Sequence, residues 1–171
     1  MALSIIGVSG DFPLNDDWAY AEGVRHVLAG DGLVLPYVNA AAVAHVALGV
    51  VAVKLWGYSY ATLRLCSILV TFAGATAFYL AAGYLRIPRY PATFLALVYA
   101  ANPILVNITF GFMSDSTGLA LNMIFFACLL FALSRKSKTA MIAAFLVLAL
   151  AVSVRQSALI FVLLSPLCLS K

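Results

Sequence analysis

Length, composition and charge exclude a soluble globular domain. The chain has 171 residues, of which 65% are hydrophobic and only 9% charged, whereas soluble domains carry about a quarter charged residues. The formal net charge is +4, but the basic residues form no continuous stripe, which argues against a nucleic-acid partner. We therefore expect an integral membrane protein whose main surroundings are a lipid bilayer.

Acidic and basic residues occupy different parts of the chain. Five of the six acids precede position 32, and the sixth is Asp115. Five of the ten basic residues form two short clusters, which are Arg86/Arg89 and Arg135/Lys136/Lys138. Basic loops next to transmembrane helices stay on the cytoplasmic side. We therefore expect both basic clusters in the cytoplasm and Asp115 on the outer side.

The first 59 residues predict an outer loop with juxtamembrane helices. Residues 15–30 have the spacing of an amphipathic helix with Trp18, Ala21, Val24 and Leu28 on its apolar face, and Asn15 or Asp16 is the candidate cap. The apolar stretch 39–56 is barely long enough to cross a bilayer. We favour an interfacial position for it, because a spanning segment would put Asp16 on the opposite side from Asp115.

The remaining residues predict transmembrane helices over 60–85, 92–110, 117–133 and 140–170. The last run is interrupted by Arg155 and Gln156. The expected fold is all-α: a multi-span transmembrane helix bundle over 60–171, preceded by the outer loop 1–59. Three isolated cysteines, Cys66, Cys128 and Cys168, predict neither a metal site nor a redox pair.

Three acids are candidates for chemistry, because the expected topology brings Asp16, Asp17 and Asp115 to the same side of the membrane. Carboxylates at a membrane surface can deprotonate an acceptor hydroxyl or hold a divalent cation. The alternative is that these acids only cap helices. The sequence does not identify a cofactor, but Asp16, Asp17 and Asp115 are the candidate ligands of a divalent cation.

Arg155 is the main candidate for binding a phosphate. A charged side chain inside an apolar run costs several kcal/mol unless it is paired, and a guanidinium binds phosphate with two parallel hydrogen bonds. An interhelical salt bridge to Asp115 is the alternative. Lys54 and Arg64, also expected on the outer side, are further candidates for the lipid phosphate, or else interfacial anchors.

Several short segments carry a resemblance to a known family. They are residues 15–21 (NDDWAYA), 54–59 (KLWGYS) followed by 61–65 (ATLRL), 101–103 (ANP), 112–115 (FMSD) and 154–156 (VRQ). In this order they resemble the GT-C glycosyltransferases of the protein mannosyltransferase and aminoarabinose transferase type. Leu33, Val34 and Leu35 stand where some relatives carry charged residues, so candidate metal ligands are missing there.

The resemblance implies a reaction and its residues. It implies inverting transfer of a sugar from a polyprenyl-phosphate carrier to a hydroxyl of a glycan, lipid or protein acceptor, outside the bacterial plasma membrane. Asp16 or Asp17 would be the catalytic base and Asp115 the second acid. The family's first transmembrane helix has no counterpart here, and family members have more spans than this chain can hold, so we expect a truncated N-terminal part of such an enzyme. The alternatives from other classes are a multi-span transporter using an Arg155–Asp115 pair and a non-catalytic membrane subunit.

Overall fold

The computed structural model describes residues 11–14, 16–35 and 42–163, and within these ranges every regular element is a helix. In chain order they are α2 (Asp17–Ala29), α3 (Val43–Trp56), α4 (Tyr60–Tyr84), α5 (Arg89–Ala100), α6 (Pro103–Thr109), α7 (Ser114–Arg135), α8 (Lys138–Val154) and the 3₁₀ helix η1 (Gln156–Ala158). The all-helical fold expected from the sequence is therefore confirmed for these residues, and the helices fall within the predicted segments except that the segment 92–110 is broken in two.

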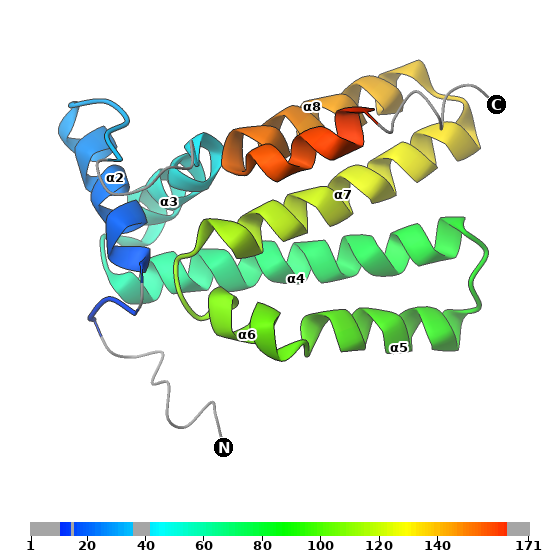
Figure 1. Cartoon of the computed structure of the whole chain (residues 1–171), viewed down its shortest axis with the longest axis horizontal. Helices are drawn as coiled ribbons and strands as arrows, with labels where there is room; N and C mark the ends of the chain where they lie inside the picture. The colour runs from blue at the N-terminus through cyan, green and yellow to red at the C-terminus, as the bar shows by residue number, and fades with distance from the viewer. Residues whose placement is uncertain (1–10, 15, 36–41, 164–171) are drawn as a thin grey trace.

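The long helices form a bundle in which α4 and α7 are neighbours (Figure 1). Small residues let these two helices approach closely, since a Cβ atom added to Gly74 would lie only 2.7 Å from Cα of Ala120. Ala77, Ala81 and Ala127 continue this contact as one buried cluster. On the other faces, α5 and α6 lie beside α4, and α8 lies beside α7.

The apolar helices indicate a lipid bilayer environment. Two of them, α4 and α7, are long and apolar enough to cross a membrane, and α5 with α6 makes a third if this bent pair is one span. Apolar side chains such as Phe72 and Ile104 are largely exposed on the outside of the bundle, as lipid-facing residues are. α3 and α8 are apolar but shorter.

The expected span 92–110 is not one straight helix. The structure breaks it between α5 and α6, whose axes differ by 56°. Pro103 begins α6, and the Asn102 side chain accepts hydrogen bonds from the backbone N–H groups of Ile104 and Leu105. Proline cannot donate the backbone hydrogen bond that would continue α5, and asparagine is a strong helix cap. Together they end one helix and start another.

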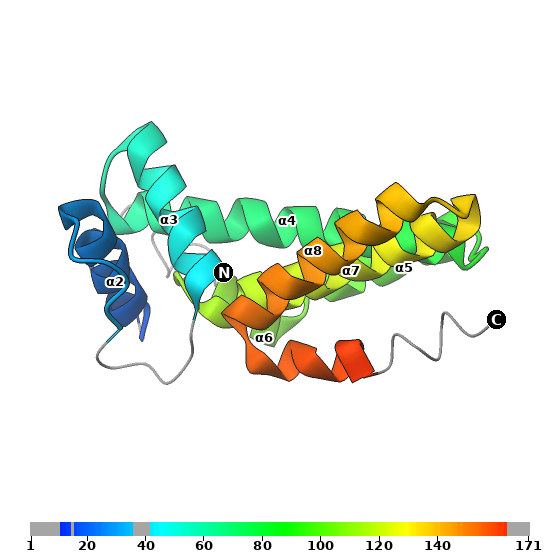
Figure 2. The same ribbon diagram turned by 90° about the horizontal axis from the view of Figure 1, so that it is seen from above.

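The interruption expected at Arg155 is confirmed. α8 ends at Val154, and Arg155 has an extended backbone conformation with φ −142° and ψ 122°. After η1, residues 159–163 are helical again and run back along the bundle (Figures 1 and 2). Phe161 packs against the rings of Phe125 and Phe126 there. Residues 164–170 of the expected run lie outside the described residues.

The predicted apolar face of α2 is only partly buried. Ala21 and Val24 are buried as expected, but Trp18 and Leu28 are exposed, and Asp17 and Tyr20 are buried instead. The reason is that Tyr20 and Val24 join a core cluster with residues of α3 and with Phe112, the loop residue before α7. Figure 2 shows α2 and α3 at a steep angle to the long helices. The expected cap Asn15 lies outside the described residues, and Asp16 occupies the cap position without a side-chain cap bond.

Candidate functional site

The polar residues singled out in the sequence gather at one end of the bundle. The basic turns α4–α5 and α7–α8 lie at the other end (Figure 1), where Tyr84 and Phe131 are in ring contact. α2, α3, the start of α7 and the end of α8 meet at the first end. This separation of acidic and basic ends is the arrangement that the charge pattern predicted.

Asp115 and Arg155 form an ion pair at this end. Nη2 of Arg155 donates a hydrogen bond to Oδ2 of Asp115, and both side chains are 38% exposed. Asp115 is in the first turn of α7, where a negative charge is favoured by the helix dipole. It does not cap the helix, because the cap position is Met113. The arginine side chain crosses α7 over Gly118, where an added Cβ atom would lie 3.2 Å from Cγ of Arg155.

Ser114 links this ion pair to α2. Nε of Arg155 donates to Oγ of Ser114 over 3.3 Å, and the hydroxyl of Tyr20 lies 2.8 Å from the same oxygen. Tyr20 is one turn after Asp17, so the chain of hydrogen bonds runs from the helix that carries the early aspartates to Arg155. These contacts join Asp115 and Arg155 to α2, in which Asp17 lies one turn before Tyr20. We call the polar residues in and beside these contacts the Arg155 cluster: Asp17, Tyr20, His45, Ser114, Asp115, Thr117 and Arg155.

Asp17 is the most unusual member of the cluster. It is fully buried, and within the described part of the chain neither carboxylate oxygen has a hydrogen-bond partner at normal geometry. Burial raises the pKa of Asp17 above its ordinary value, although nearby backbone groups, including those of Leu14 and Phe112, and the charge of Arg64 favour the ionised form. A buried carboxylate with few partners is costly, which is why perturbed groups of this kind tend to mark functional sites.

His45 is a cluster residue that the sequence analysis did not select. It is buried, its Nδ1 atom lies 2.9 Å from Oγ1 of Thr117, and its ring stacks on Phe112 at a centroid distance of 3.9 Å. Tyr20 meets the same ring edge-on at 5.2 Å. Burial lowers the pKa of His45 from 6.5 to about 3, and the charge of Arg155 acts in the same direction. The imidazole is therefore neutral at physiological pH.

The other predicted residues lie at the edge of the cluster or outside it. Asp16 is exposed at the start of α2. Arg64 is buried near the start of α4, where it donates to the backbone carbonyl of Phe12 and acts on Asp17 through its charge. Lys54 is exposed in the last turn of α3, two turns and more beyond His45. The structure therefore brings Arg64 near the cluster and leaves Lys54 away from it.

The described residues form no evident metal-binding site. No group of three or more histidine, cysteine, aspartate or glutamate side chains lies close enough to hold an ion there. The acid that would be a natural ligand, Asp115, is already paired with Arg155. The cluster as described is suited to binding an anion through Arg155 rather than a cation.

Sequence reasoning missed Tyr20, His45, Ser114 and Thr117. A usable signal was present for two of them: Ser114, Thr117 and Gly118 have the i, i+3, i+4 spacing of one helix face at the start of an apolar helix. That small polar face is the one on which Arg155 and His45 lie. No local pattern distinguishes Tyr20 or His45 from other residues of their helices.

The comparisons with known proteins give no relative: no family model, no curated protein and no solved structure matches this chain.

Proposed function

We propose that this chain belongs to a membrane glycosyltransferase that moves a sugar from a polyprenyl-phosphate carrier to an acceptor hydroxyl. The observation that supports the proposal is the Arg155–Asp115 ion pair and its link through Ser114 and Tyr20 to α2, the helix that begins at Asp17, at the end of the bundle away from both basic turns. Such a reaction needs a carboxylate that acts as a base and a positively charged side chain that binds the phosphate, and the two must lie in the same site. The helices are proposed to form a multi-pass bundle in a bacterial plasma membrane, with the cluster on the outer side.

Asp16 is the proposed catalytic base. The acceptor oxygen attacks the anomeric carbon, the bond between that carbon and the carrier phosphate breaks, and the electron pair leaves with the phosphate. The acceptor proton passes to a carboxylate that must touch the hydroxyl. Asp16 is exposed and has no cap bond to release, whereas Asp17 is buried. Asp17 is therefore proposed to position the start of α2 rather than to take the proton.

Arg155 is the proposed ligand of the carrier phosphate. Its guanidinium is only partly buried, so a phosphate can reach it from the membrane surface. Asp115 accepts a hydrogen bond from this guanidinium. A phosphate that binds there competes with Asp115, and the freed carboxylate is then available as the second acid of the site. Arg64 contributes through its charge on Asp17, and Lys54 is a candidate for contacts farther along the carrier.

Activity measurements on the gene's full product test these roles. Membranes containing the protein are supplied with a radiolabelled polyprenyl-phosphate sugar, and the loss of label from the carrier is followed. Asp16→Asn is expected to lower turnover by about 10²–10⁴-fold, as loss of a general base does. Asp31→Asn is the matched control, because Asp31 is an exposed acid at the far end of α2 that contacts His26. Unchanged turnover in both Asp16→Asn and Asp115→Asn contradicts the proposal.

A second candidate function is favoured by the Arg155–Asp115 ion pair itself. Such a pair suits a transporter or a non-catalytic membrane subunit, in which it joins α7 to the end of α8. A charge exchange separates the two functions. In the double variant Asp115→Arg with Arg155→Asp the pair can re-form, so a purely structural or transport role is restored. Binding of a phosphate at position 155 is lost, so the proposed transferase stays inactive.

A further inference from the structure

A membrane-facing binding site lies at the opposite end of the molecule, around Arg89. This residue begins α5 and lines two hollows. The first lies between α4 and α5 and is lined by Tyr79, Leu80, Gly83, Tyr84 and Ala92, among others. The second runs along α5, where Tyr90, Thr93, Phe94 and Leu97 line it. The two hollows have volumes of about 400 and 410 Å³, and Arg89 lines both of them.

The position of Arg89 at the ends of two apolar helices makes it accessible to membrane lipids. α4 ends and α5 begins at this turn; α4 is long and apolar enough to cross a bilayer, and α5 is so together with α6. The turn is therefore at headgroup depth, and the two hollows extend from it along apolar helix surfaces. Phe94 and Leu97 are 66% and 62% exposed, so lipid chains have direct access to the second hollow.

Charge adds a preference for anionic ligands. The basic residues Arg86, Arg89, Arg135, Lys136 and Lys138 all belong to the two turns at this end. The six acids precede position 32 or stand at Asp115, so within this pair of turns no carboxylate offsets the positive charge. A basic pocket beside apolar helices is the feature that binds anionic lipid headgroups.

We propose that Arg89 binds the phosphate of an anionic diacyl phospholipid in the leaflet at the basic end. One acyl chain lies in the hollow between α4 and α5, and the other lies along α5. The guanidinium supplies two parallel hydrogen bonds to the phosphate oxygens. Tyr79 and Tyr84, which line the first hollow, supply hydroxyl groups suited to a headgroup.

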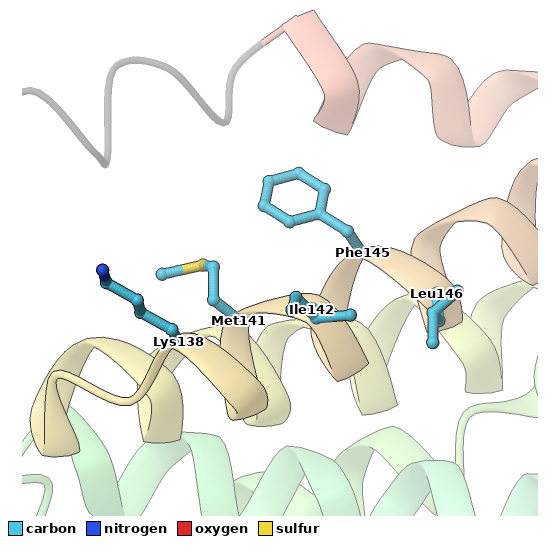
Figure 3. Close-up of a pocket in the computed structure, with 5 residues that line it drawn as sticks. All are labelled: Lys138, Met141, Ile142, Phe145 and Leu146. Atoms are coloured by element: carbon cyan, nitrogen blue, oxygen red, sulfur yellow. The ribbon is translucent and has the colours of Figure 1, made fainter.

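A hollow on α8 shows why the site is assigned to Arg89. It is lined by Lys138, Met141, Ile142, Phe145 and Leu146 (Figure 3). Lys138 gives this hollow a positive charge, but the other lining residues are apolar and all of them come from α8. Lysine binds phosphate as a point charge without the paired geometry of arginine. Of these two sites, the one at Arg89 combines a guanidinium with two tyrosines and with two hollows.

Lipid binding to the delipidated full chain in detergent tests the proposal, with native mass spectrometry as the readout. Phosphatidylglycerol is compared with phosphatidylcholine of the same acyl chains. We expect about fivefold tighter binding of the anionic lipid, and Arg89→Gln removes this preference. Arg86→Gln is the matched control: it removes an equal charge from the same turn, but Arg86 lines neither hollow. It is expected to keep most of the preference.

A second variant tests the hollow without changing charge. A Cβ atom added to Gly83 meets nothing within 4 Å, and Gly83 lines the first hollow, so the side chain of Gly83→Leu is expected to occupy part of that hollow. We expect it to lower the amount of bound phosphatidylglycerol several-fold while the melting temperature stays the same. Equal losses in Arg86→Gln and Arg89→Gln, or unchanged binding in Gly83→Leu, would overturn the proposal. Displacement of the lipid by millimolar inorganic phosphate would do so too, because it would show a simple anion site.

Discussion

A single buried histidine gives the acidic end of the molecule a predictable response to pH. His45 keeps its neutral form in the fold down to about pH 3, whereas the unfolded chain takes up the proton near pH 6.5. Between these values the unfolded state binds more protons. The stabilisation is therefore complete above about pH 6.5 and is lost as the pH falls towards 3, by at most about 1.4 kcal/mol per pH unit.

Thermal unfolding in detergent at pH 7.5, 6.0 and 5.0 checks this pH response. The wild-type melting temperature is expected to fall across the series, and His45→Gln is expected to start lower but to fall less steeply, because glutamine does not titrate. Asp17 opposes this trend: its raised pKa means that protonation favours the fold as the pH falls. Parallel pH curves for wild type and His45→Gln would show that His45 is not the responsible group.

Tyr20 tests the hydrogen bond that links α2 to the Arg155 cluster. Tyr20→Phe keeps the buried ring but removes the hydroxyl that lies 2.8 Å from Oγ of Ser114. The expected loss is about 1 kcal/mol of unfolding free energy, measured by chemical unfolding in mixed micelles. Tyr90→Phe is the control, since Tyr90 is 88% exposed on α5 and its loss of a hydroxyl is expected to be neutral. Equal stabilities for both variants would argue against a structural bond at Tyr20.

At the scale of helices, two glycines of α4 predict opposite outcomes for the same substitution. Gly74→Ala places a methyl group against the backbone of Ala120, so α4 and α7 must separate, and we expect a cost of about 1–3 kcal/mol. Gly83→Ala meets open space and is expected to be neutral or to stabilise by about 0.5–1 kcal/mol, because glycine is a poor helix former. Melting temperatures in detergent distinguish them. A neutral Gly74→Ala would mean that α4 and α7 are not held at this close contact.

The break between α5 and α6 shows which features of a helix depend on neighbouring residues and which depend on distant contacts. Asn102 and Pro103 adjoin in the chain, so a helix end at this point follows from backbone chemistry alone. The hydrophobic run 92–110 masked that signal, because length and apolarity fit a straight span equally well. The direction of α6 after the break depends on contacts such as Thr71 with Thr109, which join residues far apart in the chain.

At the scale of the whole molecule, the separation of acidic and basic ends predicts a labelling pattern. Single cysteines are introduced at Asp16, Asp115, Arg86 and Ser137 in a background without the native cysteines. An impermeant thiol reagent applied to intact spheroplasts is expected to label positions 16 and 115, whereas positions 86 and 137 react only after the membrane is opened. The physical reason is that basic turns are retained in the cytoplasm. Labelling of 16 and 115 from opposite sides would also end the proposed transferase function.

The sequence by itself determined where the helices lie. Apolar length, the basic turns and the charged interruption at Arg155 predicted the segments in which the structure has its helices, apart from the break between α5 and α6, because these signals act over a few neighbouring residues. Charge segregation likewise predicted that both basic turns lie at one end and Asp115 at the other. The membrane environment follows from composition, and the apolar lengths of α4 and α7 agree with it.

Only the tertiary structure decided which side chains meet. Tyr20 and Ser114 are 94 residues apart, and His45 and Thr117 are 72 apart, so no local pattern could pair them. The same packing buried Asp17 and exposed Trp18, because α2 contacts α3 and Phe112 through Tyr20, Ala21 and Val24 and so buries only part of its predicted apolar face. Helix positions are a property of short stretches of chain, whereas the polar cluster exists only once distant helices are packed together.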